Sequence, residues 1–142
     1  SAQEDGEAER FTDHAPHHTD EKECEFDQAA NGIIGLETAL PLGLRLVAEG
    51  VLDLPTLVRR MTCGPAAILG LPGGTLAAGA AADITLVDPA ARWTYRAGDG
   101  RSKSRNTPFD GQEFTGRVTT VLVGGRVVYD GAADRSPLRS AS

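Results

Sequence analysis

The sequence is short of basic charge and of cysteine, and each shortage excludes a class of protein. Its 142 residues carry 14 lysines and arginines against 20 aspartates and glutamates, a formal net charge of −6. Nucleic-acid binding needs clustered positive charge, so this balance argues against a nucleic-acid partner. The two cysteines, Cys24 and Cys63, lack CxxC spacing. They indicate a reducing compartment, and therefore a cytoplasmic location, rather than a disulfide framework.

Long apolar runs are also missing. None approaches the roughly 20 residues that a membrane-spanning helix needs, so we expect no membrane segment. The first ten residues, SAQEDGEAER, contain no apolar stretch of the kind that a signal peptide requires, and we expect a chain that begins partway through a longer protein. With 40% hydrophobic and 24% charged residues, the remaining composition is typical of a globular domain.

Helical signals fill the first half of the chain after a long polar stretch. Residues 13–31 show no sustained period, so we expect a loop there. Apolar spacing predicts a helix over residues 36–49 that stops at Gly50 and that either starts late or kinks at Pro41. Two shorter helices should follow, one capped by Asp53 and ending near Met61, the other over residues 65–69.

Strand signals fill the second half. Residues 82–89 predict a strand that ends at Pro89. Residues 118–123 and 126–129 are joined by Gly124-Gly125, which predicts a hairpin with a primed turn. Trp93 and Tyr129 are expected to pack within this β unit, and residues 132–142, small and polar, to form a frayed and disordered tail.

All three histidines of the chain lie in one window, Asp13-His14-Ala15-Pro16-His17-His18. Carboxylate oxygen and neutral imidazole nitrogen are the usual protein ligands of zinc beside thiolate. Consecutive loop positions rarely converge on one ion, however. We therefore expect this window to contribute to a metal or catalytic site completed elsewhere; a solvated polar loop is the alternative interpretation.

The residues from Asp13 onward, DHAPHHTDEKECEFDQAANGIIGLETALPL, resemble the signature of class I dihydroorotases, members of the amidohydrolase superfamily. The likeness continues in order through MTCGPAAILGLPGGTLAAGAAADITLVDP, SKSRNTPFDG and VTTVLVGGRVVYDG. The first segment is highly specific, whereas ADITLVD and the hairpin are common to many amidohydrolases. This resemblance makes the run from Ser102 to Asn106 a structural loop near the barrel, in preference to a phosphate site.

The resemblance implies an α/β fold: the C-terminal portion of a metal-dependent (β/α)8 barrel plus the C-terminal part of a small β-sandwich-like domain. Residues 1–72 would be the end of the barrel, with the catalytic loop and the closing helices, and residues 73–131 the β domain. Residues up to Thr12 would approximate the last barrel strand, although Arg10 is unusual for a buried strand. A whole barrel needs about 250 residues, so only a part is expected here.

The activity implied is that of a dihydroorotase, the zinc-dependent reversible cyclisation of N-carbamoyl-L-aspartate to L-dihydroorotate in pyrimidine biosynthesis. Asp13 would bind the metal and act as the catalytic acid/base, passing a proton from the attacking hydroxide to the leaving nitrogen. His17 would bind the substrate carboxylate. Asn31 and Gly32 would line the substrate with main-chain groups, and Asn31 departs mildly from the Phe or Pro that is commoner there.

The family's other metal ligands, an HxH pair, a bridging carboxylate and two further histidines, lie upstream of this segment and have no counterpart here. We therefore expect the isolated chain to be inactive and to hold no tight zinc, whether the full centre has one metal or two. His14 and His18 would have structural or supporting parts. Expected partners are the substrate, aspartate transcarbamoylase and a second copy of the chain. Three alternatives stay open: an allantoinase- or hydantoinase-like enzyme, a non-catalytic homologue that scaffolds aspartate transcarbamoylase, and a truncated inactive product.

Overall fold

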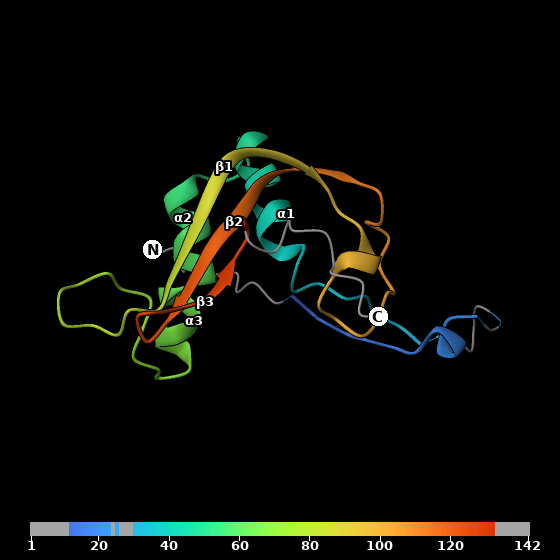
Figure 1. The fold of residues 1–142 in the computed structure, drawn as a ribbon, viewed down its shortest axis with the longest axis horizontal. Coiled ribbons are helices and arrows are strands. Elements are labelled where there is room, and N and C mark those ends of the chain that lie inside the picture. The colour runs from blue at the N-terminus through green and yellow to red at the C-terminus, as the bar shows by residue number, and fades with distance from the viewer. Residues whose placement is uncertain (1–11, 24, 26–29, 133–142) are drawn as a thin grey trace, which may run out of the picture.

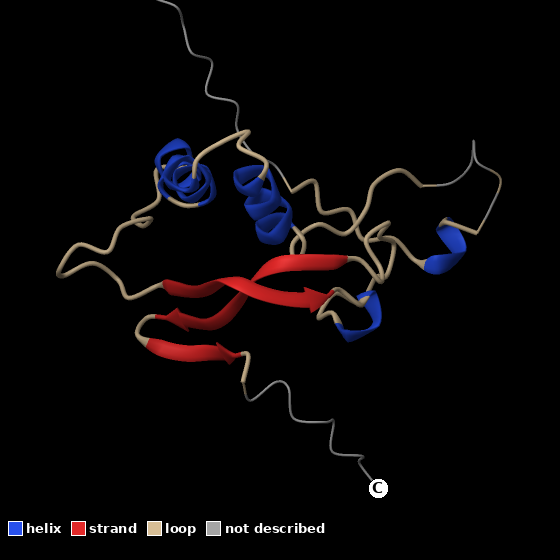
Figure 2. Ribbon diagram, turned by 90° about the horizontal axis from the view of Figure 1, so that it is seen from above, coloured by secondary structure: helices blue, strands red, loops and turns tan. Residues whose placement is uncertain are grey.

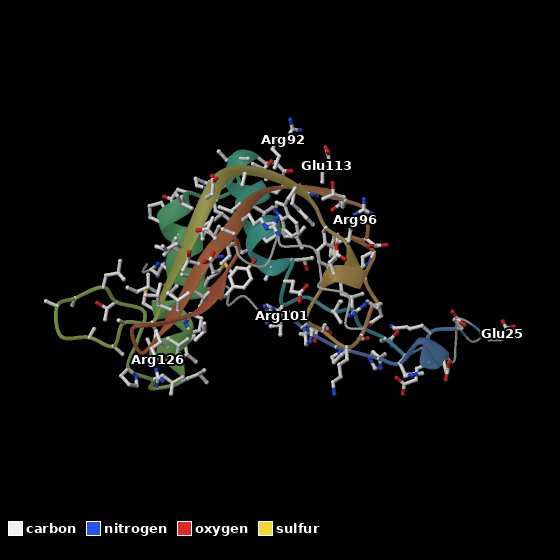
Figure 3. All side chains as sticks on the ribbon, viewed as in Figure 1. Glu25, Arg92, Arg96, Arg101, Glu113 and Arg126 are labelled. Carbon is white, nitrogen blue, oxygen red and sulfur yellow. The ribbon has the colours of Figure 1, made fainter. Side chains whose placement is uncertain are left out.

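The computed structural model describes residues 12–23, 25 and 30–132, and shows helices lying over one face of a small antiparallel sheet, with a long loop extending to one side (Figures 1 and 2). The architecture is α/β, as predicted. The expected last barrel strand before Thr12, the Cys24 thiol and the tail from residue 133 lie outside the described residues. No helix in the described part is long and apolar enough to cross a membrane.

Helix α1, Ala39–Ala48, starts three residues later than the predicted boundary of 36 and resolves the alternative left open at Pro41. Pro41 lies in its first turn, where a missing N–H costs no helical hydrogen bond, so the helix begins late instead of kinking. The stop at Gly50 is confirmed. Gly50 has φ +72°, its N–H donates to the Val47 carbonyl, and the next N–H, from Val51, reaches Leu46.

Helices α2, Leu54–Met61, and α3, Cys63–Ile68, follow after short turns. The Asp53 cap is confirmed, since its Oδ1 accepts from the Thr56 N–H at 2.7 Å. Leu57, on the inner face of α2, is almost fully buried. The predicted third helix was placed two residues too far along the chain at its start.

We expect Asp53→Ala to lower the melting temperature of the protein by removing this cap. Hydrogen bonds from Thr56 hold the pKa of Asp53 below its ordinary value. A depressed folded-state pKa means that the stabilisation is present above the unfolded-state pKa and is lost as pH falls through the folded-state pKa. Thermal unfolding measured against pH should therefore show the wild type and Asp53→Ala converging in acid, with Asp53→Asn, which keeps a capping oxygen, staying near the wild type.

The sheet has the order β1-β2-β3, with β1 at Ile84–Thr94, β2 at Glu113–Val123 and β3 at Arg126–Asp130. Both pairings are antiparallel. The predicted hairpin is confirmed: Gly124 and Gly125 have φ +54° and +77°, and positive φ at both central positions defines a type I′ turn. Its first strand, however, begins at Glu113 rather than at residue 118.

The prediction that the first strand ends at Pro89 is wrong. β1 continues to Thr94 because the pairing with β2 shifts between Asp88 and Arg92, leaving Pro89 in an irregularity of the ladder. Proline has no N–H to donate and is tolerated at such a point. Asp88 Oδ1 accepts from the N–H groups of Ala90 and Ala91, which compensates for the lost ladder bonds.

The core joins the sheet to α1. Tyr95, Ala97 and Phe114 are its buried members, and the aromatic rings pack edge-on or tilted, with Trp93 and Tyr95 centroids 6.0 Å apart. Leu42 of α1, Trp93 and Phe109 close the cluster. The expected packing of Trp93 in the β unit is confirmed, with its indole N–H on the Gly116 carbonyl at 3.0 Å. This core anchors both ends of the connection between β1 and β2.

Candidate active site

The histidine window folds back against the segment that precedes α1. His14 and Ile33 form a parallel bridge, and the Ala15 N–H donates to the Ile33 carbonyl at 2.9 Å. Between them the chain makes an excursion that contains the short 3-10 helix η1, Thr19–Glu21, drawn in blue at one end of the molecule (Figure 1). Two segments that are separated by residues 18–30 therefore lie side by side. Together we call residues 13–17 and 31–35 the substrate loop, after the role that the sequence predicts for them.

Asp13 begins the substrate loop with an exposed side chain. Its φ of +43° is the only positive value at a non-glycine position among the described residues. Aspartate visits this left-handed region more readily than most residues, but the conformation still has a cost and concentrates at functional sites. The structure thus presents the Asp13 carboxylate to the outside on a backbone of unusual conformation.

His17 is held at both its main chain and its ring. Nδ1 lies 3.2 Å from Oε2 of Glu21, and the ring is about one-quarter exposed. The backbone hydrogen bond from His18 and then the bond with His17 lower the pKa of Glu21. An ionised carboxylate can only accept a hydrogen bond, so Nδ1 is the donor in this contact. Nε2 faces the Gly32 side of the loop, 3.9 Å from where a Cβ on Gly32 would stand.

Gly32 is required by both its conformation and its surroundings. It has φ +101°, and a Cβ there would come within 2.4 Å of the Ala15 Cβ. Its carbonyl accepts from Lys22 Nζ at 2.8 Å, while Asn31 is exposed beside it. The structure therefore brings Gly32 and His17 together, as two of the predicted substrate-binding residues, with Asn31 next to them.

The other two histidines have different surroundings. His14 Nδ1 accepts from the Gly35 N–H at 3.1 Å, which fixes the ring as the tautomer with its proton on Nε2. This contact agrees with the structural part expected for His14. His18 is exposed, with Nδ1 3.2 Å from Oδ2 of Asp20.

Sequence reasoning assigned no site role to three residues that hold the substrate loop. Lys22 donates to the carbonyls of Ala30 and Gly32. Ser104 and Asn106, about 90 residues away, bond to the window at His17 and Ala15. The basic polar run around Ser104 was the available signal. Its predicted role as a structural loop is confirmed by these contacts.

The donor atoms fit part of a zinc site. Asp13 offers an exposed carboxylate, a suitable ligand. His14 Nδ1 is taken by a backbone N–H and His17 Nδ1 by Glu21, so neither ring can chelate together with Asp13 through that atom. Within the described residues, no three His, Cys, Asp or Glu side chains gather in a way that could hold a metal ion.

Comparison with known proteins identifies the class. The Amidohydrolase family model matches residues 12–128, and the chain belongs to that family. Over 118 residues it is 61% identical to a dihydroorotase of Pelobacter propionicus and 59% identical to a dihydroorotase of Geobacter metallireducens. These alignments cover 83% of this chain but 28% of each relative, so the chain spans under a third of their length.

Solved structures give the same fold. A dihydropyrimidinase from Brevibacillus agri superposes with a TM-score of 0.77 at 28% identity, covering 84% of this chain and 27% of that one. An L-hydantoinase from Arthrobacter aurescens superposes with a TM-score of 0.68 at 37% identity, covering 73% of this chain and 24% of that one. In both cases the likeness falls on only about a quarter of the other protein's length.

Proposed function

We propose that this chain is the C-terminal portion of a dihydroorotase, which interconverts N-carbamoyl-L-aspartate and L-dihydroorotate. The observation that carries the proposal is the juxtaposition of His17 and Gly32 in one loop that begins at the exposed Asp13 carboxylate. Residues 1–72 would complete the metal-dependent barrel and residues 73–131 the small β domain. The identity of 57–61% with several dihydroorotases supports this activity over others in the family.

Asp13 would be the acid/base and one metal ligand. Zinc, once bound by Asp13 and by histidines from the upstream part, would make hydroxide available near neutral pH. The Asp13 carboxylate would take up the proton released as the ring amide is attacked and return it to the departing nitrogen. This work needs a carboxylate held at the substrate and able to change protonation state. The exposed side chain and the positive φ of Asp13 support its assignment to this role.

His17, Gly32 and Asn31 would hold the substrate. The substrate carries a carboxylate, and an imidazole whose Nδ1–H is tied to Glu21 can direct Nε2–H to it in the protonated form. The Gly32 carbonyl already accepts hydrogen bonds from Lys22 and Asn106. Gly32 would therefore bind substrate through its N–H, or through the close approach that the missing Cβ permits. Asn31 would add main-chain groups.

The family resemblance also suggests a location and two partners for the enzyme. The enzyme would work in the cytoplasm, pair with a second copy and associate with aspartate transcarbamoylase. A hydantoinase- or allantoinase-like activity is the second candidate, because the superposed structures are hydantoinases and a dihydropyrimidinase. A pure scaffold for aspartate transcarbamoylase would have no need of the positive-φ Asp13 or of the Glu21-oriented His17.

Replacing His17 with asparagine should raise KM for L-dihydroorotate by about tenfold to a hundredfold, since one hydrogen bond between charged groups contributes about 1.5–3 kcal/mol. Because the proton carrier is untouched, kcat should change much less. Initial-rate kinetics on the full-length protein would measure both. His18→Asn, which changes the exposed imidazole next to His17 in the chain, is the matched control. Equal KM values in the two variants would contradict the role of His17.

The function itself is tested by comparing two samples. The full-length protein, in which we propose that the rest of the barrel precedes these residues, should turn over L-dihydroorotate and N-carbamoyl-L-aspartate. Residues 1–142 alone should retain no stoichiometric zinc after dialysis and show no turnover, measured by metal analysis and by product formation. An upstream region that encodes no HxH-bearing barrel, or a full-length protein inactive in both directions, would refute the proposal.

A further inference from the structure

Asn106 is the centre of the contacts that hold the substrate loop. Its Nδ2 donates to the Ala15 carbonyl at 2.8 Å and to the Gly32 carbonyl at 3.2 Å, so it links the two segments of that loop. Its Oδ1 accepts from the His17 N–H at 3.4 Å. Its own carbonyl accepts from the Ile34 N–H at 3.1 Å. One side chain and its peptide group thus touch four positions of the substrate loop.

Ser104 completes the arrangement. Its side chain is buried, with 8% of the residue exposed. The hydroxyl oxygen accepts from the His17 N–H at 3.0 Å, and the hydroxyl proton has two acceptors in reach, the His17 carbonyl and Asn106 Oδ1. A hydroxyl has a single proton, so the two acceptors share it. The main chain of His17 is therefore fixed at both its N–H and its carbonyl by one residue 87 positions away.

The side chains of Asn106 and Ser104 contact Ala15, His17 and Gly32, and two of these three are residues proposed to bind substrate. Only the main-chain carbonyl of Asn106 reaches the other part of the loop, at Ile34. The Asp13 side is held by other bonds: His14 Nδ1 with the Gly35 N–H, and the Ala15 N–H with Ile33. The bonds on the Asp13 side therefore do not use the Asn106 or Ser104 side chain, although Ala15 takes part in both sets through its N–H and its carbonyl.

We propose that Asn106, assisted by Ser104, is a positioning residue that sets the distance between His17 and Gly32 for the substrate carboxylate. The inference rests on the proposed function, which supplies that substrate. Neither residue need touch the substrate itself; each acts through the loop. Asn106 and Ser104 lie in the connection between β1 and β2. This connection is held in place by the core of Tyr95, Ala97 and Phe114. Sites placed by locked side chains on a packed support retain their geometry better than sites on a free loop.

The test is steady-state kinetics on Asn106→Asp in the full-length protein. The new carboxylate has no N–H for the Ala15 and Gly32 carbonyls and faces both with negative charge, so the two sides of the loop should separate. We expect KM for L-dihydroorotate to rise about tenfold to a hundredfold, the cost of losing one hydrogen bond to a charged group, with kcat within about threefold. Gln112→Glu makes the same amide-to-acid change in the β unit, where the side chain accepts from Arg45, and should leave KM unchanged.

A second pair of variants separates positioning from folding. Ser104→Ala removes the hydroxyl, and Ser104→Thr keeps it, so we expect a raised KM in the first and recovery toward the wild type in the second. Hydrogen exchange of the His17 N–H, which needs no turnover, should be faster in Ser104→Ala and Asn106→Asp. A purely structural role would instead lower kcat in step with the melting temperature and leave KM alone. That result, or unchanged His17 exchange, would overturn the inference; an inactive wild type would refute the proposed function instead.

Discussion

Replacing Asp13 with asparagine is expected to lower kcat of the full-length protein for L-dihydroorotate by about 10²- to 10⁴-fold or more. General acid/base catalysis by a positioned side chain contributes on this scale, and an amide cannot take up the proton. Loss of the proposed metal ligand should add to the effect. The substitution keeps the size of the side chain and one of its oxygens. The fold should therefore be preserved, and the loss should appear in kcat at saturating substrate.

The matched control is Asp20→Asn. Asp20 lies in the same region of the chain, is largely exposed, and has its contact with His18 rather than with the segment before α1. The same loss of a carboxylate at this position should leave kcat within about twofold, as is usual for surface changes. Near-normal kcat in Asp13→Asn, or equal losses in the two variants, would remove Asp13 from the chemistry.

Gly32→Ala is expected to produce the second large effect, a fall in kcat/KM of about a hundredfold. A Cβ at position 32 would be 2.4 Å from the Ala15 Cβ, a separation that real structures do not allow. The two segments of the substrate loop must then move apart, which displaces the His17 ring from Gly32. Kinetics and thermal unfolding of the full-length variant would measure the loss of activity and any loss of stability together.

Gly79→Ala is the control for the backbone cost alone. Gly79 has φ +89°, close to the +101° of Gly32, but nothing lies within 4 Å of where its Cβ would stand. Both substitutions place alanine in a left-handed conformation, and only one meets a neighbour. Gly79→Ala should show only the fall in melting temperature that the left-handed backbone causes, whereas Gly32→Ala should show a larger fall and the loss of activity. Equal activities would show that the close approach at Gly32 has no functional part.

Those parts of the fold that depend on neighbouring residues could be predicted from the sequence. Asp53 caps α2 and Gly124-Gly125 turn the hairpin because both signals act within four residues. The end of β1 could not be predicted in this way. Pro89 disfavours a strand locally, but the shifted pairing with β2 tolerates it, and that pairing is a tertiary property. The start of β2 at Glu113 was also not predicted. Gly116, with φ +91°, interrupts the alternation of side chains that is expected of a strand.

The residues of the candidate site also differ in whether the sequence could identify them. Asp13, His17 and Gly32 lie in one continuous motif, so resemblance to a family could identify them, and the structure adds that Gly32 lies against the His17 loop. The residues around Ser104 and Asn106 do not indicate that these side chains contact the substrate loop. Their hydrogen bonds cross 74 to 91 residues of sequence, and the spacing in a single sequence holds no trace of such contacts.

The most direct test of the account is the substrate preference of the full-length protein. L-Dihydroorotate and dihydrouracil share the ring amide that is cleaved, but only dihydroorotate carries the carboxylate assigned to His17. We predict a kcat/KM for L-dihydroorotate at least about a hundredfold above that for dihydrouracil or hydantoin, because a site built to hydrogen-bond a polar group rejects the analogue that lacks it. A protein that hydrolyses dihydrouracil or hydantoin as well as L-dihydroorotate, or better, would contradict the account.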